Sequence, residues 1–192
     1  EMSSFNRNSA YLIHFANNVW DFGPIQPVSG NNPFQMTRAN VTSFSPFAIG
    51  NIDAIPGNVK PLHLTVFLES LFNGTTMNKA QGIAGDQFSG TVADHIFVEI
   101  HDFAPPFSLV AGPYMVELDM DGSAPVEVPA PLSANYYVAV KHRNSIETWS
   151  GIPLDFGNPD ISYDFSSDVG QAYGSNLKLL SGKFVFYGGD VN

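Results

Sequence analysis

The residues best equipped for chemistry follow the most strand-like run of the sequence. The stretch YYVAVKHRNSIETWSG, residues 136–151, combines a cluster of charged and amide groups with a nearby acid and tryptophan, namely Lys141, His142, Arg143, Asn144, Glu147 and Trp149. Imidazole, guanidinium and carboxylate groups this close in sequence can transfer protons, bind a ligand or anchor the end of a strand. Which of these roles the groups have depends on the strand and the loop that position them.

The alternation of the preceding run favours anchoring. Successive side chains of a strand point to opposite faces, so His142 shares the core-facing side with Val138 and Val140 if the alternation continues. A buried histidine there needs hydrogen-bond partners and can pin the strand end. Arg143 or Asn144 can satisfy backbone carbonyls of the following loop. We therefore interpret His142 and Arg143 as a structural polar anchor.

Ligand binding is the second interpretation. The stretch NSIETWSGIP, residues 144–153, is predicted to be a loop in which Trp149 is either a lid over the core or an exposed platform, with Glu147 and Asn144 as hydrogen-bonding neighbours. Residues 73–94 form a second stretch without strand pattern, too long for a simple connection. If the chain binds a ligand, we expect Trp149 and this second stretch to lie near it.

Catalysis finds little support in the sequence. A glycosidase needs two facing carboxylates, one with a raised pKa, and no spacing among the 18 acidic residues selects such a pair. A serine hydrolase of the common type needs a G-x-S-x-G elbow between a strand and a helix, and the chain contains none. We expect no enzymatic activity.

Calcium is the one cofactor that the sequence suggests. Asp190 and Asn192 match positions one and three of a D-x-[DN]-x-[DN]-G loop, although its other ligands are missing. The run DMDG, residues 119–122, resembles the same pattern. Asp121-Gly122 between two alternating runs is explained better as the turn of a β-hairpin spanning residues 114–128.

Composition excludes several partners. The chain has 192 residues, 18 acidic against 8 basic, and a formal net charge of −10, so the backbone of a nucleic acid would be repelled. No apolar run reaches the roughly 20 residues that cross a bilayer, so we expect no membrane insertion. The absence of cysteine excludes disulfides, thiolate metal sites and a cysteine nucleophile.

The periodicity along the chain is that of short strands separated by turn residues, without a convincing helix. Two strand pairs are predicted within residues 1–50, interrupted by PIQPVSGNNP. Seven or eight strand candidates follow in residues 59–192. The fold class is therefore all-β: an antiparallel β-sandwich, immunoglobulin- or transthyretin-like, at residues 59–192. A linker at 51–58 precedes it. Residues 1–50 form a small β-element that packs on the sandwich or completes a preceding β-module.

Several segments resemble a known kind of module. VTSFSPFAIGN, after a strand carrying Trp20, resembles the closing strands of a β-sandwich common in large secreted proteins of Bacteroidetes. LTVFLESLFNGTTMNKA, DHIFVEIHD, YYVAVKHRNSIETWSG and LLSGKFVFYGGDVN resemble the module that follows it, over residues 61–192. The resemblance implies a secreted or outer-cell-surface location, and a continuation into dockerin-like calcium repeats or a type IX secretion sorting domain. It implies no enzymatic activity.

Together these observations predict a non-catalytic structural or adhesive module of a secreted or surface-attached bacterial protein, within an extracellular assembly. Its expected partners are neighbouring domains of the parent protein, and glycans or like subunits bound through strand edges. The alternative is a carbohydrate-binding module appended to a polysaccharide-active enzyme. That alternative requires an exposed aromatic platform.

Overall fold

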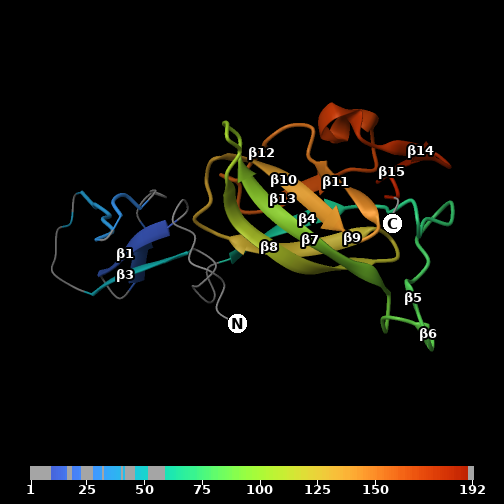
Figure 1. Cartoon of the computed structure of the whole chain (residues 1–192), viewed down its shortest axis with the longest axis horizontal. Coiled ribbons are helices and arrows are strands. Elements are labelled where there is room, and N and C mark those ends of the chain that lie inside the picture. The colour runs from blue at the N-terminus through green and yellow to red at the C-terminus, as the bar shows by residue number, and fades with distance from the viewer. Residues whose placement is uncertain are drawn as a thin grey trace.

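The computed structural model describes residues 10–16, 19–22, 28–31, 33–39, 41, 46–51 and 59–189. Within these ranges the chain is built of β-strands, with two single-turn 3-10 helices and no α-helix (Figure 1). The predicted all-β, sandwich-like fold is confirmed.

Two sheets form the sandwich. The larger has the order β11-β10-β7-β8 and consists of β7 (Val92–Asp102), β8 (Leu109–Asp119), β10 (Asn135–His142) and β11 (Ser145–Trp149), with β12 (Leu154–Asp155) added beside β10. The smaller has the order β13-β4-β9 and consists of β4 (Val59–Thr65), β9 (Ser123–Pro129) and β13 (Ile161–Asp164). All of these pairings are antiparallel except β13 with β4, which is parallel. The predicted antiparallel sandwich therefore contains this one parallel pair.

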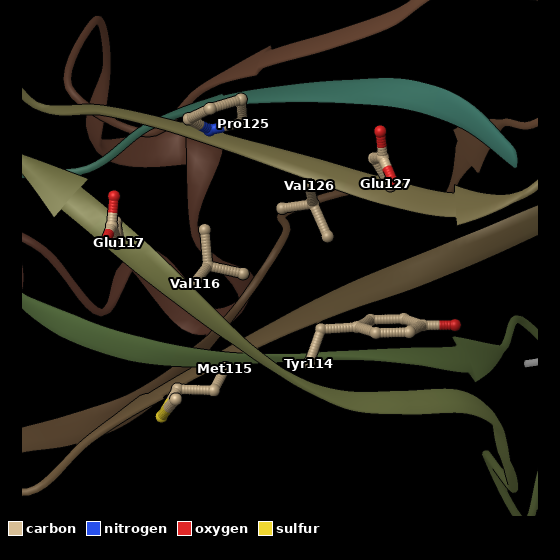
Figure 2. Close-up of a pocket in the computed structure, with 7 residues that line it drawn as sticks. All are labelled: Tyr114, Met115, Val116, Glu117, Pro125, Val126 and Glu127. Carbon is tan, nitrogen blue, oxygen red and sulfur yellow. The ribbon is translucent and has the colours of Figure 1, made fainter.

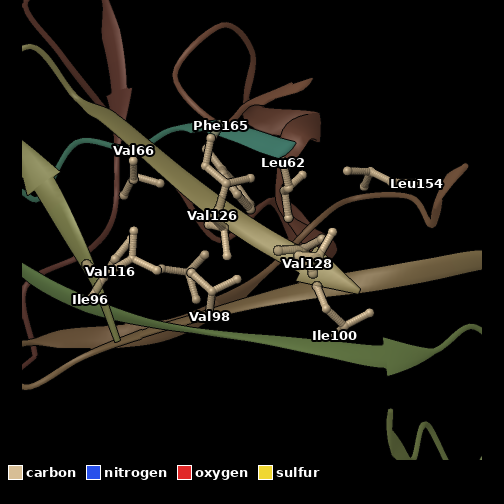
Figure 3. Packing of buried hydrophobic residues seen from close by; sticks show 14 of the residues in the cluster. Leu62, Val66, Ile96, Val98, Ile100, Val116, Val126, Val128, Leu154 and Phe165 are labelled. Atoms are coloured by element: carbon tan, nitrogen blue, oxygen red, sulfur yellow. The ribbon is translucent and has the colours of Figure 1, made fainter. Parts of the chain in front are cut away.

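The core lies between the two sheets. Ile96, Val98 and Ile100 of β7 alternate onto one face and are fully buried, as their spacing predicts. Val126 and Val128 of β9 face them from the other sheet (Figure 3). Burying each such side chain contributes about 1.5–3 kcal/mol relative to exposure, so the packing of the two faces is what holds the strands of the larger sheet in place.

The predicted hairpin at residues 114–128 is wrong. A tight turn does occur, because Gly122 has a φ of +92° and its N–H donates to the Asp119 carbonyl at 2.9 Å. However, β8 and β9 belong to different sheets, so the turn carries the chain across the sandwich. A Cβ at Gly122 would lie 2.7 Å from the ring of Phe67, and glycine therefore permits this crossing beside the core.

The N-terminal residues form a sheet of their own. Its order is β2-β1-β3, from β1 (Ala10–Ala16), β2 (Val19–Phe22) and β3 (Phe47–Asn51), all antiparallel. The first predicted strand pair is present as β1 and β2. The second supplies only β3 among the described residues, and residues 33–39 contribute no strand beyond an isolated bridge from Gln35 to Ser29. Residues 52–58 of the predicted linker lie outside the described residues, and the division into domains stays a prediction.

Smaller elements complete the described chain. The stretch 73–94, predicted to lack strands, contains the hairpin of β5 (Gln81–Gly82) and β6 (Gly85–Asp86) and the start of β7. After β13 follow η2 (Val169–Gln171), η3 (Tyr173–Ser175), β14 (Lys178–Leu180) and β15 (Lys183–Val185). None of the helical segments that the structure describes has the length and apolar character needed to span a membrane.

Candidate functional site

Trp149 lies on a strand, contrary to the prediction of a loop. It is the last residue of β11 and pairs with Ala139 of β10. β11 is the last strand in the order of its sheet, and its inner face is partly polar because Thr148, which pairs with Val140, is buried. The sequence of β11 lacks apolar alternation because β10, rather than a hydrophobic pattern of its own, holds it in the sheet.

Trp149 forms part of an aromatic pocket. The cavity has a volume of about 290 Å³ and is lined by four aromatic residues, namely Phe107, Tyr137, Trp149 and Tyr173. Tyr137 comes from β10, Phe107 from the connection between β7 and β8, and Tyr173 from the start of η3. Tyr173 is 65% exposed and Phe107 41% exposed. We call these four residues the aromatic pocket.

A close approach of two chain segments places Tyr173 in the pocket. Ser150 forms an antiparallel bridge with Ala172, and the next residue, Tyr173, lines the same cavity as Trp149. The approach is possible because position 151 is glycine: a Cβ on Gly151 would lie 2.0 Å from the carbonyl oxygen of Gly170. Gly151 therefore fixes where η3 meets β11.

Phe107 is held in an unusual backbone conformation. Its φ is +56°, in the left-handed region that a bulky residue seldom adopts. Its N–H donates to the Ala104 carbonyl at 2.8 Å, which closes a turn, and its own carbonyl oxygen lies 2.9 Å from Nδ1 of His101. Strain of this kind concentrates at ligand sites, where the surrounding contacts must hold it.

The four rings meet at steep angles. Phe107 is inclined at 75° to Tyr137 and at 80° to Trp149, with ring centroids 6.1 and 6.4 Å apart. Tyr137 is inclined at 87° to Tyr173 and at 56° to Trp149. The rings therefore wall a hollow from several directions and do not form one flat platform.

A polar network supports the pocket on the same face of the larger sheet. The ring of His101 packs against that of Trp149, with centroids 4.3 Å apart, and its Nε2 lies 3.0 Å from Oε2 of Glu99. Nζ of Lys141 lies 2.7 Å from Glu99 and 3.6 Å from Glu147. The indole N–H of Trp149 donates to Oε1 of Glu147 at 2.7 Å, so the contacts of these residues form a closed ring that returns to the indole.

The charges of this network are set by its contacts. Burial raises the pKa of Glu99, but hydrogen bonds from Lys141 and His101 outweigh it, and the net shift is downward. The hydrogen bond that Lys141 donates to Glu99 raises the pKa of Lys141, against a smaller opposing effect of burial. Glu99 is therefore an ionised carboxylate at neutral pH, and Lys141 an ammonium ion paired with two acids.

The predicted polar anchor lies at the C-terminal end of β10. His142 is buried on the same side as Val138 and Val140, as the alternation predicts. Its Nε2 lies 3.2 Å from Oδ2 of Asp94, and Arg143 donates to both oxygens of Asp94 at 2.7 and 2.6 Å. Asp94 on β7 is the partner that sequence reasoning missed, because the pairing spans 48 residues.

The same residues include a serine–histidine–aspartate chain. Oγ of Ser145 lies 3.2 Å from Nδ1 of His142, on the opposite side of the ring from Asp94. Burial lowers the pKa of His142, against the effect of Asp94, so the ring is neutral at pH 7. Nδ1 also accepts the backbone N–H of Asn144 at 3.2 Å. That bond occupies the lone pair that a general base would use, and the His142 side chain is only 1% exposed.

The remaining predicted site residues do not join the pocket. Asn144 is exposed and bonds through its backbone, accepting the N–H of Gly189 at 3.0 Å. No residue of the stretch 73–94 lines the pocket, contrary to expectation, and Gln87 from that stretch contacts Arg143 instead. Asp190 and Asn192 lie outside the described residues. Within the described part of the chain, no three histidine, aspartate or glutamate side chains gather in a way that would hold a metal ion.

A second hollow lies where β8 and β9 converge on the turn that joins them (Figure 2). It has a volume of about 450 Å³ and is lined by Tyr114, Met115, Val116, Glu117, Pro125, Val126 and Glu127. Val116 and Val126 are core residues that lie between the two ribbons, and Glu117 and Glu127 flank them. The hollow is the open side of the sandwich between the edge strands of its two sheets.

No family model, curated protein or solved structure matches this chain. The resemblance to secreted Bacteroidetes modules therefore stays an expectation from sequence segments, and the functional argument rests on the geometry of the site.

Proposed function

We propose that this chain is a non-catalytic adhesive module that binds a ligand in the aromatic pocket. The observation that supports this proposal is the convergence of four aromatic side chains from separate segments around one hollow of about 290 Å³. Aromatic rings are normally packed in a core, and a concave cluster with exposed members is typical of a ligand site. The fixed sheet beneath the pocket suits a rigid binding surface.

The polar network supports binding in preference to catalysis. Glu99 and Glu147 are two carboxylates near one hollow, but hydrolysis needs one of them protonated near neutral pH. The pKa of Glu99 is shifted downward, and Lys141 is bonded to it while lying near Glu147. These groups orient Trp149 and set the local charge.

The proposed setting is a secreted or surface-attached bacterial protein, in which the sandwich also spaces neighbouring domains. This part of the proposal rests on the sequence resemblance and on the acidic composition. The edge strand β8, with eleven residues, offers a second surface through which like subunits can associate.

Carbohydrate binding is the second candidate. The exposed Tyr173 and the acid Glu147 beside Trp149 favour it, since sugars combine ring stacking with hydrogen bonds to acids. The angles of 75–87° between several rings argue against it, because a pyranose stacks best on one flat face.

A fragment screen followed by ¹H–¹⁵N NMR tests the proposal. Small neutral, cationic and anionic fragments are added in turn, and a glycan array with and without calcium tests the carbohydrate alternative. We expect shifts at pocket residues that disappear in Trp149→Ala and persist in Phe97→Ala, an exposed aromatic of β7 that does not line the pocket. A screen in which no fragment perturbs the pocket would refute the proposed function.

A further inference from the structure

We propose that the aromatic pocket is a cage for a quaternary ammonium group, of the kind found in choline and in trimethylated lysine. This inference rests on the proposed function and specifies its ligand. The recognition chemistry is the attraction between a cation and the negative faces of several aromatic rings.

The angles between the rings are the first argument. A trimethylammonium group is nearly spherical, so it gains most when rings surround it from different directions. Phe107 stands at 80° to Trp149, and Tyr137 at 87° to Tyr173, which gives walls in different planes around one hollow. A flat ligand would find one favourable face and would contact the other walls only at their edges.

The charge beside the cage is the second argument. The Glu147 carboxylate accepts the indole N–H of Trp149, and Glu99 lies behind His101, which packs on the same indole. Lys141 and His101 both contact Glu99, whereas Glu147 is the carboxylate that touches the indole directly. The whole chain carries −10. The Glu147 carboxylate beside the indole and the overall negative charge attract a cation and repel an anion.

The size and rigidity of the pocket agree with a head group. Ligand pockets commonly span about 300–1,000 Å³, and this cavity is at the lower limit. Contacts already fix the walls: His101 packs on Trp149 and its Nδ1 lies against the carbonyl oxygen of Phe107. A pocket that is formed in advance loses little conformational entropy on binding.

The same charges discriminate between sources of the group. A phosphate next to the ammonium, as in phosphocholine, would lie near Glu147, while Lys141 is already paired with Glu99. We therefore expect free choline and trimethyllysine to bind more tightly than phosphocholine. The cage recognises an ammonium group without an adjacent anion.

The test compares tetramethylammonium and choline with 3,3-dimethyl-1-butanol, which has the shape of choline but no charge. The chain has two tryptophans, so a Trp20→Phe background makes Trp149 the single indole reporter. Fluorescence titration and calorimetry then give Kd. We expect choline to bind about tenfold or more tighter than the neutral analogue, and phosphocholine to bind more weakly than choline.

Variants separate the ring faces from general hydrophobicity. Tyr173→Leu keeps an apolar side chain and removes an aromatic wall, so it should weaken choline at least about threefold and leave the neutral analogue unchanged. Phe103→Ala removes an exposed aromatic of the Phe107 loop that does not line the cavity, and should change neither Kd. Equal binding of choline and the neutral analogue, or binding of the neutral analogue alone, would overturn the cage while leaving the proposed function intact. Fragment hits at the pocket without any response to tetramethylammonium would overturn it in the same way.

Discussion

The indole ring of Trp149 packs on the imidazole ring of His101, with centroids 4.3 Å apart and an angle of 40°. This contact joins the aromatic pocket to the polar network, since the same imidazole lies 3.0 Å from Glu99. The position of the indole is therefore set from the sheet side by a buried residue and from its edge by Glu147. Substitutions in the polar network should therefore change ligand binding in the aromatic pocket.

Replacing Glu147 with Gln should weaken cation binding without affecting the fold. The amide oxygen can still accept the indole N–H, but the negative charge next to the cage is lost. We expect the Kd for tetramethylammonium to rise about two- to fivefold, while that for 3,3-dimethyl-1-butanol stays the same. Equal losses for both ligands would mean that Glu147 acts on pocket shape and not through charge.

Gly151→Ala should disturb the pocket from outside it. The added methyl group would lie 2.0 Å from the Gly170 carbonyl oxygen, so the segment that carries Tyr173 must move. We expect a loss of about 1–3 kcal/mol in the free energy of unfolding, and weaker ligand binding. Gly82→Ala, where the nearest atom is 3.6 Å away, is the matched control and should change neither quantity. Unchanged binding in Gly151→Ala would show that Tyr173 is placed by other contacts.

His142→Ala should destabilise the sandwich. Asp94 is buried, and removing the imidazole leaves it with Arg143 and the backbone N–H of His95, and takes the imidazole partner from the Ser145 hydroxyl. We expect a loss of about 1–3 kcal/mol by urea unfolding, with ligand binding retained. His63→Ala serves as control because His63 forms an exposed pair with Asp160, and such pairs contribute little. A melting temperature equal to that of the parent would refute the anchor.

The stability of the fold should fall as the pH drops below about 6.5. Burial lowers the pKa of His142 in the folded state, so between its folded pKa and about 6.5 the unfolded chain binds a proton that the folded chain does not. The free energy of unfolding therefore rises with pH across that window and reaches its full value above it. His142→Gln should flatten this part of the profile in urea unfolding measured from pH 5 to 8. An identical slope in the variant would assign it to other groups.

The sequence predicts the strands whose own residues alternate. Ile96, Val98 and Ile100 mark β7, and Val138 and Val140 mark β10, because each strand buries one apolar face. The same alternation places His142 on the core side. The sequence alone is enough to predict a strand where its apolar alternation matches the face that the fold buries.

Features that depend on distant partners are not predictable in this way. The Asp121-Gly122 turn has the composition of a hairpin, yet its two strands belong to different sheets. β11 is polar and holds its place through β10. The pocket combines Phe107 with Tyr173, 66 positions later, and only the fold brings them together.

The most direct test follows the indole N–H signal of Trp149 in ¹H–¹⁵N spectra of the full chain during titration with tetramethylammonium. The account predicts a saturable shift of that signal and of the Phe107 backbone signal, which requires more ligand in Tyr173→Ala and is unchanged in Phe103→Ala. A Trp149 signal that stays in place up to high ligand concentration, or that responds equally to 3,3-dimethyl-1-butanol, would contradict the cage.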